Sequence, residues 1–278
     1  MSGTLDGKVA FITGVARGQG RAHAVRLARE GADIGGIDIC SQMETVGYPL
    51  ATERDLEHTV ELVEHNGGRM VGRVGDVRDR TSIETAFKET VAELGRVDFV
   101  IANAGIMPIW GDHCQTMQAW QDCIDVMLTG VLNTVEVAYP QLVEQGTGGS
   151  IVITSSIGSV KPMMRTLDAK TLGMLSYTAV KAGVVNLMEN YASVLASHSI
   201  RVNTLHPAVT RTPMTDNDMS RDRMATAHPE DLKAFSHALP VDVMEPEEMS
   251  SAVAWLCSDE SRYYTGNQML IDAGAHLR

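Results

Sequence analysis

Tyr177 and Lys181 stand four positions apart in the segment 176–183, whose sequence is Ser-Tyr-Thr-Ala-Val-Lys-Ala-Gly. Residues with this spacing share one face of a helix, so the ammonium group would lie beside the phenol. The pKa of a free tyrosine is about 10, and a neighbouring positive charge lowers it. Tyr177 could therefore act as a general base that takes the proton of an alcohol while a hydride leaves the same carbon. Taken alone, such a pair is also common on exposed helix faces, so the rest of the chain must decide.

An apolar run that breaks into glycines indicates a binding site for a phosphate. Residues 9–13 read Val-Ala-Phe-Ile-Thr, and Gly14, Gly18 and Gly20 complete the pattern T-G-x-x-x-G-x-G. Glycines allow a tight turn and a close approach of the backbone to a pyrophosphate, whose charge the N-terminus of the next helix stabilises. The segment predicts a buried strand, a dinucleotide-binding turn and a helix, although a plain strand-to-helix turn would share much of this pattern.

The expected dinucleotide is NAD rather than NADP. Asp38 ends the next apolar segment, 18 residues after Gly20, where dinucleotide-binding folds place the carboxylate that accepts a hydrogen bond from the adenosine ribose. That carboxylate would repel a 2′-phosphate. Arg17 favours the opposite choice because its charge could pair with the phosphate, but no arginine follows Asp38 at positions 39 or 40.

Alternating apolar and amphipathic segments indicate the fold that positions these residues. The pattern predicts α/β architecture over residues 1–278, a single-domain Rossmann-type doubly wound parallel sheet flanked by helices. One long helix is expected over 117–144, and the helix that carries Tyr177 is expected to begin at Ser176. After the first strand, further strands are expected at 34–39, 70–75, 97–102, 150–154, 200–205 and within 266–274.

Two connections are longer than those usual in such folds. The irregular segment at about 40–52 contains Gly47 and Pro49 and is expected to be an insertion that serves a binding site or an interface. The polar, methionine-bearing stretch at about 211–240 is expected to be a mobile lid over a substrate.

Composition restricts the classes of partner. With a net charge of −12, the protein is not expected to present the basic surface that binding of nucleic acids requires. The sequence shows neither a secretion signal nor an apolar run of about 18 residues, so we expect a cytoplasmic protein without a membrane span. The four cysteines form no C-x-x-C pair and the histidines form no H-E-x-x-H motif, so we expect reduced thiols and no metal site.

The glycine turn, Asp38, Asn103-Ala104-Gly105 and Y-x-x-x-K occur in the order typical of the short-chain dehydrogenase/reductase family, and the chain resembles that family over essentially its whole length. The resemblance implies that Ser156, rather than Ser155, holds the substrate oxygen. It also implies that Lys181 anchors the cofactor ribose in addition to tuning Tyr177. The cofactor contacts expected from the turn and from the resemblance are Gly14, Arg17, Gly18, Gln19, Gly20, Asp38, Ile39, Asp76, Val77, Asn103, Ala104, Gly105, Tyr177, Lys181, Pro207, Thr210 and Thr212.

The chain departs from the family pattern at several positions. Ala102 stands at the first position of the usual N-N-A-G, so one side chain that stabilises the strand is absent, and Ala208 replaces a glycine after Pro207. Met127 stands where many members have an asparagine that holds a water linking the lysine to solvent. A thioether is a weak acceptor and no donor, so the proton relay must take another route or slow down. Residues 161–175 are expected to be an insertion at the mouth of the pocket.

Within the family, the chain looks like the carveol dehydrogenase and mycofactocin-coupled subgroup. The resemblance rests on Asp-Ile-Cys at the end of the second strand, on Tyr48-Pro49-Leu50-Ala51-Thr52, and on the C-terminal Thr265-Gly266 and Asp272-Ala273-Gly274. It implies tightly held NAD, an apolar secondary alcohol such as a terpenoid, a peptide-derived redox carrier (mycofactocin) and a homotetramer. The 16 methionines, several near the expected pocket, suit an adaptable apolar cavity, although core packing explains any single one as well.

The expected function is therefore NAD-dependent interconversion of an apolar secondary alcohol and its ketone. A 3-oxoacyl-thioester reductase of the same family is an alternative, but it would prefer NADPH and a basic surface for an acidic carrier protein. Met127 and Ala102 together motivate a second alternative, a catalytically weak NAD-binding scaffold. The intact set of Ser156, Tyr177 and Lys181 favours the enzyme.

Overall fold

The computed structural model describes residues 4–278, so the first three residues of the expected domain lie outside the described part. Seven strands form one wholly parallel sheet in the order β3-β2-β1-β4-β5-β6-β7. The order reverses direction at β1, which is the mark of a doubly wound sheet. The predicted fold class is thereby confirmed. The strands are β1 (Val9–Thr13), β2 (Asp33–Asp38), β3 (Met70–Val74), β4 (Phe99–Ala102), β5 (Gly149–Thr154), β6 (Ile200–Pro207) and β7 (Gln268–Ile271).

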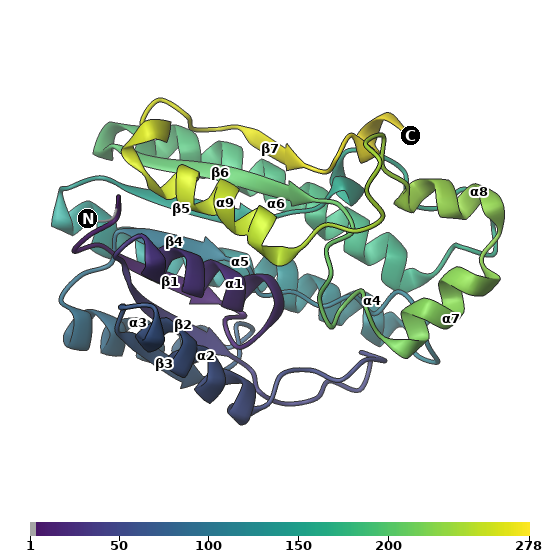
Figure 1. Cartoon of the computed structure of the whole chain (residues 1–278), viewed down its shortest axis with the longest axis horizontal. Coiled ribbons are helices and arrows are strands. Elements are labelled where there is room, and N and C mark those ends of the chain that lie inside the picture. Colours follow the sequence, from purple (N-terminus) through teal and green to yellow (C-terminus); the bar gives the residue numbers. More distant parts are fainter. Residues whose placement is uncertain (1–3) are drawn as a thin grey trace.

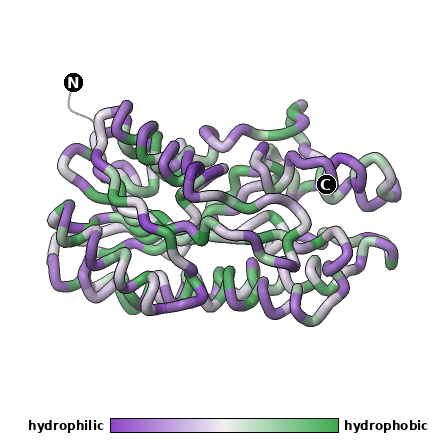
Figure 2. Tube along the Cα trace, turned by 90° about the horizontal axis from the view of Figure 1, so that it is seen from below, coloured by the Kyte–Doolittle hydropathy of each residue, from purple (hydrophilic) through white to green (hydrophobic). Residues whose placement is uncertain are grey.

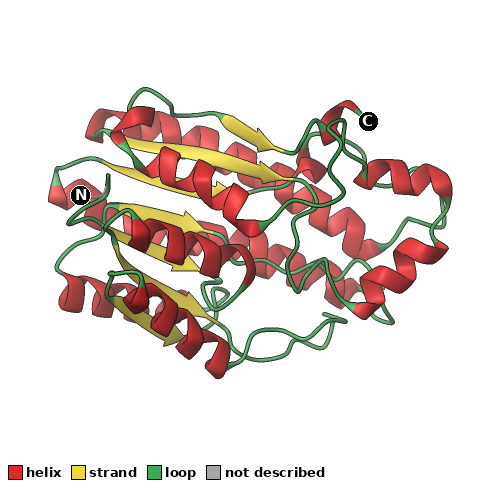
Figure 3. Ribbon diagram, viewed as in Figure 1, coloured by secondary structure: helices red, strands yellow, loops and turns green. Residues whose placement is uncertain are grey.

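Helices cover both faces of the sheet (Figures 1 and 3). One layer consists of α1 (Gly18–Arg29), α2 (Glu53–His65) and α9 (Pro246–Cys257). The other consists of α3 (Arg80–Leu94), α5 (Gly130–Gln145) and α6 (Leu172–Leu195). Side chains alternate along a strand, so the sheet contributes to a separate apolar core on each face. Ile12 packs in the core beneath α1 and α9, whereas Phe11 packs in the core beneath α3 and α5. In Figure 2 the apolar positions concentrate between the layers.

The expected helix over 117–144 is interrupted in the structure. It consists of α4 (Met117–Ile124), a π-helical turn at Asp125–Thr129, and α5. In the π turn the amide of Gly130 donates to the carbonyl of Asp125, five residues earlier. A π turn adds one residue to a helical repeat, and the apolar pattern of the sequence does not reveal so small an insertion.

The helix that carries Tyr177 also begins earlier than expected, at Leu172 instead of Ser176. Thr171 caps it, because its hydroxyl accepts a hydrogen bond of 3.0 Å from the amide of Met174.

The long connections gather beyond the carboxyl ends of the strands, toward which α4, α7 (Asp218–Thr226) and α8 (Pro229–Leu232) also extend (Figure 1). In doubly wound sheets this edge is where ligands bind. No helix among residues 4–278 combines the length and apolarity that crossing a bilayer would demand.

Candidate active site

A cavity of about 320 Å³ opens at the carboxyl edge of the sheet. It falls within the size range of small-molecule sites. Of the expected site residues, all except Gly20 line this cavity, although they come from segments spread over nearly 200 positions of the chain, from Gly14 to Thr212. The fold thus brings the sequence motifs together at one place.

Two glycines shape the first turn. Gly14 has φ of +68°, and a Cβ there would lie 2.9 Å from the Cα of Ala104, so the two loops meet by backbone contact. Gly20 does not line the cavity, and its contact with the cofactor stays a prediction. A Cβ on Gly20 would lie 2.0 Å from the carbonyl oxygen of Gly14, so this glycine lets α1 pack directly against the turn.

Asp38 ends β2 at the bottom of the cavity with only 9% of its surface exposed. Its carboxylate accepts a hydrogen bond of 2.9 Å from the amide of Ala16. Burial nevertheless raises the pKa of Asp38 above its ordinary value. Arg17, the residue that favoured NADP, donates to the carbonyl of Pro49 in the segment 40–52. Its guanidinium is therefore already engaged with the protein.

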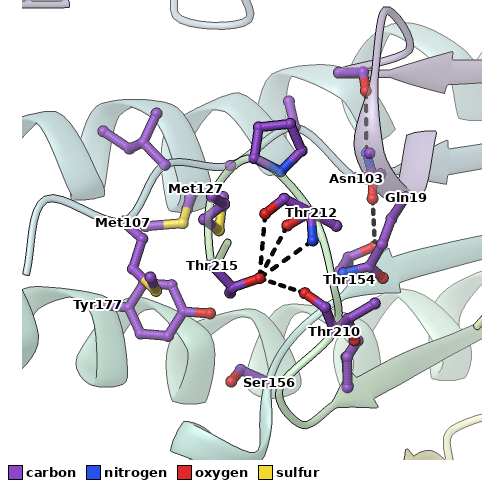
Figure 4. Close-up of a pocket in the computed structure, with 18 of the residues that line it drawn as sticks. Gln19, Asn103, Met107, Met127, Thr154, Ser156, Tyr177, Thr210, Thr212 and Thr215 are labelled. Atoms are coloured by element: carbon purple, nitrogen blue, oxygen red, sulfur yellow. Dashed lines mark hydrogen bonds between the residues drawn. The ribbon is translucent and has the colours of Figure 1, made fainter. Parts of the chain in front are cut away.

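Lys181 and Tyr177 lie on the inner face of α6, as their spacing predicted. The Lys181 ammonium donates a hydrogen bond of 2.7 Å to the carbonyl of Thr154 at the end of β5, and lies 5.8 Å from the centre of the Tyr177 ring. Ser156 follows two residues after Thr154, and Figure 4 shows its side chain and that of Tyr177 on the same side of the cavity. Ser155 donates to the carbonyl of Lys181 at 2.7 Å, so its hydroxyl is occupied by the backbone, which favours Ser156 as the substrate contact.

Burial dominates the ionisation of this pair. It lowers the pKa of Lys181 to about 8, because the ammonium loses contact with water. Burial also raises the pKa of the Tyr177 phenol, an effect that a hydrogen bond with Ser156 opposes. The protein groups alone thus do not lower the pKa of Tyr177. The tyrosine therefore needs further positive charge nearby in order to act as a base.

Asn103 holds three strands together at the floor of the cavity. Its side-chain amide donates to the carbonyls of Thr13 (3.1 Å) and Gly14 (3.3 Å), and its oxygen accepts from the hydroxyl of Thr154 at 3.4 Å. These bonds join the ends of β1, β4 and β5 beside the glycine turn. They explain how the edge stays ordered although Ala102 replaces the usual asparagine.

The remaining expected contacts divide between two ends of the cavity. Asp76 lines the end near Asp38, where both oxygens of its carboxylate accept from the guanidinium of Arg78, so it is held by an ion pair. Ile39 and Val77 line the cavity at the same end.

At the other end, Thr215 donates to the carbonyl of Thr210 and accepts from the amide of Thr212 at 3.2 Å (Figure 4). This network fixes the segment after β6, and Pro207 is the last residue of that strand.

The insertion at 40–52 forms part of the cavity wall. Tyr48 is buried, lines the cavity, and its hydroxyl accepts a hydrogen bond of 3.0 Å from the amide of Met107. Thr45 donates to Asp122 of α4 at 2.5 Å, which ties the same loop to the helical layer. The sequence left the chemistry of this loop unassigned. The signal that could have identified Tyr48 as a cavity residue was a tyrosine inside an otherwise irregular insertion.

The other two long segments meet each other. The amides of Arg165 and Thr166 both donate to the carboxylate of Asp231 in α8, at 3.0 and 3.1 Å. Lys161 is buried, and its ammonium donates to the carbonyl of Ala275 near the C-terminus at 2.6 Å. Segments 161–175 and 211–240 are therefore joined through Asp231, and residues of both segments line the cavity.

Apolar side chains dominate the cavity wall near Tyr177. Sequence reasoning had not assigned Trp110 or Phe235 to the site, but their rings lie 6.2 Å apart and both line the cavity. The methionines of the wall are Met43, Met107, Met127, Met163, Met174, Met214 and Met224. Met127 itself is 1% exposed and lies inside the π turn, with its thioether toward the cavity (Figure 4).

Comparisons with known proteins agree with this geometry. The family model described as "Enoyl-(Acyl carrier protein) reductase" matches residues 14–276. The chain is 51% identical over 277 residues to an uncharacterized oxidoreductase of Mycobacterium tuberculosis, covering 97% of this chain and 96% of that protein. It is 39% identical over 283 residues to the (-)-trans-carveol dehydrogenase of Rhodococcus erythropolis, covering 99% of both.

Solved structures give the same result. The crystal structure of carveol dehydrogenase from Mycobacterium avium in complex with NAD matches with a TM-score of 0.90 and 43% identity, covering 99% of this chain and 100% of that one. A short-chain dehydrogenase from Mycobacterium paratuberculosis bound to NAD matches with a TM-score of 0.91 and 41% identity, over 99% and 100% of the two chains. The protein therefore belongs to the short-chain dehydrogenase/reductase family of oxidoreductases, as the order of its motifs predicted.

Proposed function

We propose that the protein is an NAD-dependent dehydrogenase that interconverts an apolar secondary alcohol and its ketone. The observation that carries the proposal is the position of Tyr177, which lies half-buried beside Lys181 in a cavity that Ser156 and many apolar side chains also line. The glycine turn, Asp38 and Asn103-Ala104-Gly105 would hold the dinucleotide. Bound NAD supplies the hydride acceptor and, in its oxidised form, a positive charge near the phenol.

The residues of the protein move the proton. Ser156 would donate a hydrogen bond to the substrate oxygen and orient it toward the Tyr177 hydroxyl. Tyr177, in the ionised form that the Lys181 ammonium would stabilise, would take the hydroxyl proton as the carbon loses its hydride, and the tyrosine would then be a neutral phenol. Because the apolar wall excludes water, these electrostatic effects are stronger than they would be in solvent.

The enclosing loops support a cofactor that is retained during purification. The bonds from Arg17 to Pro49 and from Met107 to Tyr48 fasten the segment 40–52 over the cavity. We therefore also propose that an external redox carrier such as mycofactocin reoxidises the cofactor in place. The resemblance to the carveol dehydrogenase subgroup supports a homotetramer, and the sequence pattern supports a cytoplasmic location. A protein mass measured under native conditions tests the subunit number together with the retained cofactor.

The description of the matching family model favours one second candidate, a reductase of acyl groups carried on acyl carrier protein. Two features count against this second candidate. Asp38 disfavours NADPH, and the net charge of −12 disfavours binding of an acidic carrier protein. Assays with NADPH and a 3-oxoacyl thioester decide between the two candidates.

The proposed reaction is tested by mixing the NAD-loaded protein with an excess of a cyclic secondary alcohol and following the absorbance of reduced nicotinamide in a single turnover. Tyr177→Phe should keep the bound NAD but lower the rate by about 10² to 10⁴. Tyr191→Phe is the matched control, because Tyr191 lies on the same helix and bonds to Glu136 outside the cavity. A Tyr177→Phe variant that retains a third of the activity would exclude Tyr177 as the base.

A further inference from the structure

Ser220 lies in the first turn of α7, within the segment 211–240, and its side chain lines the cavity. Only 3% of the residue is exposed. Its amide donates to the Asn217 side chain at 2.9 Å, which fixes the start of the helix. Its hydroxyl oxygen, however, is buried without a hydrogen-bond partner among residues 4–278.

A buried hydroxyl without a partner is unusual, because burial removes its bonds to water without replacing them. Serine in a helix commonly bonds to the carbonyl four residues earlier. For Ser220 that residue is Asp216, which precedes the helix, and no such bond forms. The structure therefore leaves this hydroxyl without a protein partner at a residue that lines the cavity.

The location of Ser220 indicates which of two expected occupants of the cavity, the cofactor or the substrate, its hydroxyl would contact. Within residues 4–278, the other lining side chain with a buried unpartnered polar atom is Gln19, which lies on the glycine turn at the cofactor end. Ser220 instead shares one face of α7 with Met224, one helical turn later, and Met224 also lines the cavity. The rings of Trp110 and Phe235, which lie 6.2 Å apart, add apolar surface to the same cavity. A hydroxyl in such surroundings suits a contact with the substrate rather than with the cofactor.

We infer that Ser220 determines substrate specificity by binding a second oxygen function of the substrate, remote from the carbon that is oxidised. The inference rests on the proposed function. The substrate class is thereby narrowed from apolar alcohols in general to largely apolar secondary alcohols that carry one additional hydroxyl or carbonyl group. An alcohol with a single oxygen would leave the Ser220 hydroxyl unsatisfied and would bind less tightly.

The test compares isopropylcyclohexanol with its analogue that carries one further hydroxyl on the isopropyl group. Binding to the NAD-loaded protein is followed by tryptophan fluorescence, since Trp110 lies in the cavity wall. The wild type should favour the dihydroxy compound, and Ser220→Ala should change the ratio of the two Kd values by about 3- to 10-fold toward the monohydroxy compound. Ser236→Ala is the matched control, because Ser236 is an exposed serine of the same segment that bonds to the carbonyl of Lys233.

Three results would overturn the inference: equal losses for both compounds in Ser220→Ala, no preference in the wild type, or loss of NAD from the variant in a native mass spectrum. The last result would assign Ser220 to the cofactor. Because binding is measured apart from turnover, failure to oxidise either alcohol would refute the proposed function, while the ratio of Kd values would still decide the role of Ser220.

Discussion

Replacing Asp38 by asparagine isolates the charge that is expected to select NAD. Asparagine keeps the shape of the side chain and an oxygen that can accept from the amide of Ala16, a bond of 2.9 Å in the structure. The substitution therefore removes the negative charge with little change of packing. NADP differs from NAD by a phosphate on the ribose that this carboxylate is expected to contact.

The size of the effect follows from Coulomb's law. Two unit charges about 4 Å apart interact by about 4 kcal/mol at an effective dielectric constant of about 20. Asp38 is 9% exposed at the edge of an open cavity, so solvent and counterions weaken this repulsion. We expect Asp38→Asn to shift the preference toward NADP by about 2 kcal/mol, roughly 30-fold in the ratio of Kd values.

The assay must work even if the cofactor does not exchange. The unfolded protein is refolded with equal concentrations of NAD and NADP, and native mass spectrometry then reads the fraction that holds each. Asp76→Asn is the matched control, because Asp76 also lines the cavity but its charge is balanced by Arg78.

A dependence on pH provides a second measurement. Burial raises the pKa of Asp38, so lowering the pH through that value should neutralise the carboxylate and weaken the NAD preference of the wild type, but not that of Asp38→Asn. If the variant keeps the wild-type ratio at neutral pH, the charge of Asp38 does not select the cofactor, and the reasoning fails.

Three further predictions concern other parts of the chain. Met127→Asn should raise the single-turnover rate if a polar group at this position restores a water-mediated route to Lys181, and an unchanged or lower rate would show that the π turn already supplies that route. Gly20→Ala should lower the free energy of unfolding by about 1 to 3 kcal/mol or more, measured by urea denaturation, because the new Cβ would lie 2.0 Å from the carbonyl oxygen of Gly14. His23 is fully buried, and burial lowers its pKa to about 3. Between this value and its ordinary pKa, the unfolded state binds one proton more than the folded state. The free energy of unfolding should therefore fall by about 1.4 kcal/mol for each unit of decreasing pH. His23→Gln should remove that part of the slope, whereas substitution of the exposed His58 should leave it, and equal slopes in both variants would refute the assignment.

The sequence predicted the parts of the site that depend on local motifs. Gly14 and Gly18 were predicted from the turn between the first strand and the first helix, and Tyr177 and Lys181 were predicted from their spacing on one helix. Each of these predictions needs only the geometry of a single segment. The parallel sheet then determines that such segments meet at one edge, which is why motifs far apart in the chain share one cavity.

The parts that sequence reasoning missed depend on contacts between irregular segments. The bond between Tyr48 and the amide of Met107 joins two loops whose mutual position no periodicity encodes. The same holds for Asp231, which binds two amides of the segment 161–175. Gly20 was assigned to the cofactor because the motif groups the three glycines, and only the fold shows that a Cβ at this position would lie 2.0 Å from the carbonyl oxygen of Gly14.

The division between regular elements and loops also separates the two tasks of the site. The groups proposed to transfer the proton stand on the end of β5 and on α6, where backbone hydrogen bonds and the contact between Lys181 and Thr154 fix them. The cavity-lining residues Met107 and Ser220, of which Ser220 is proposed to contact the substrate, stand on connections outside the sheet. Flexible thioethers can fit apolar ligands of different shape, whereas an unpartnered hydroxyl gains only from an oxygen or nitrogen at one place. Changes in these connections can therefore alter the substrate while the position of Tyr177, and with it the type of reaction, is retained.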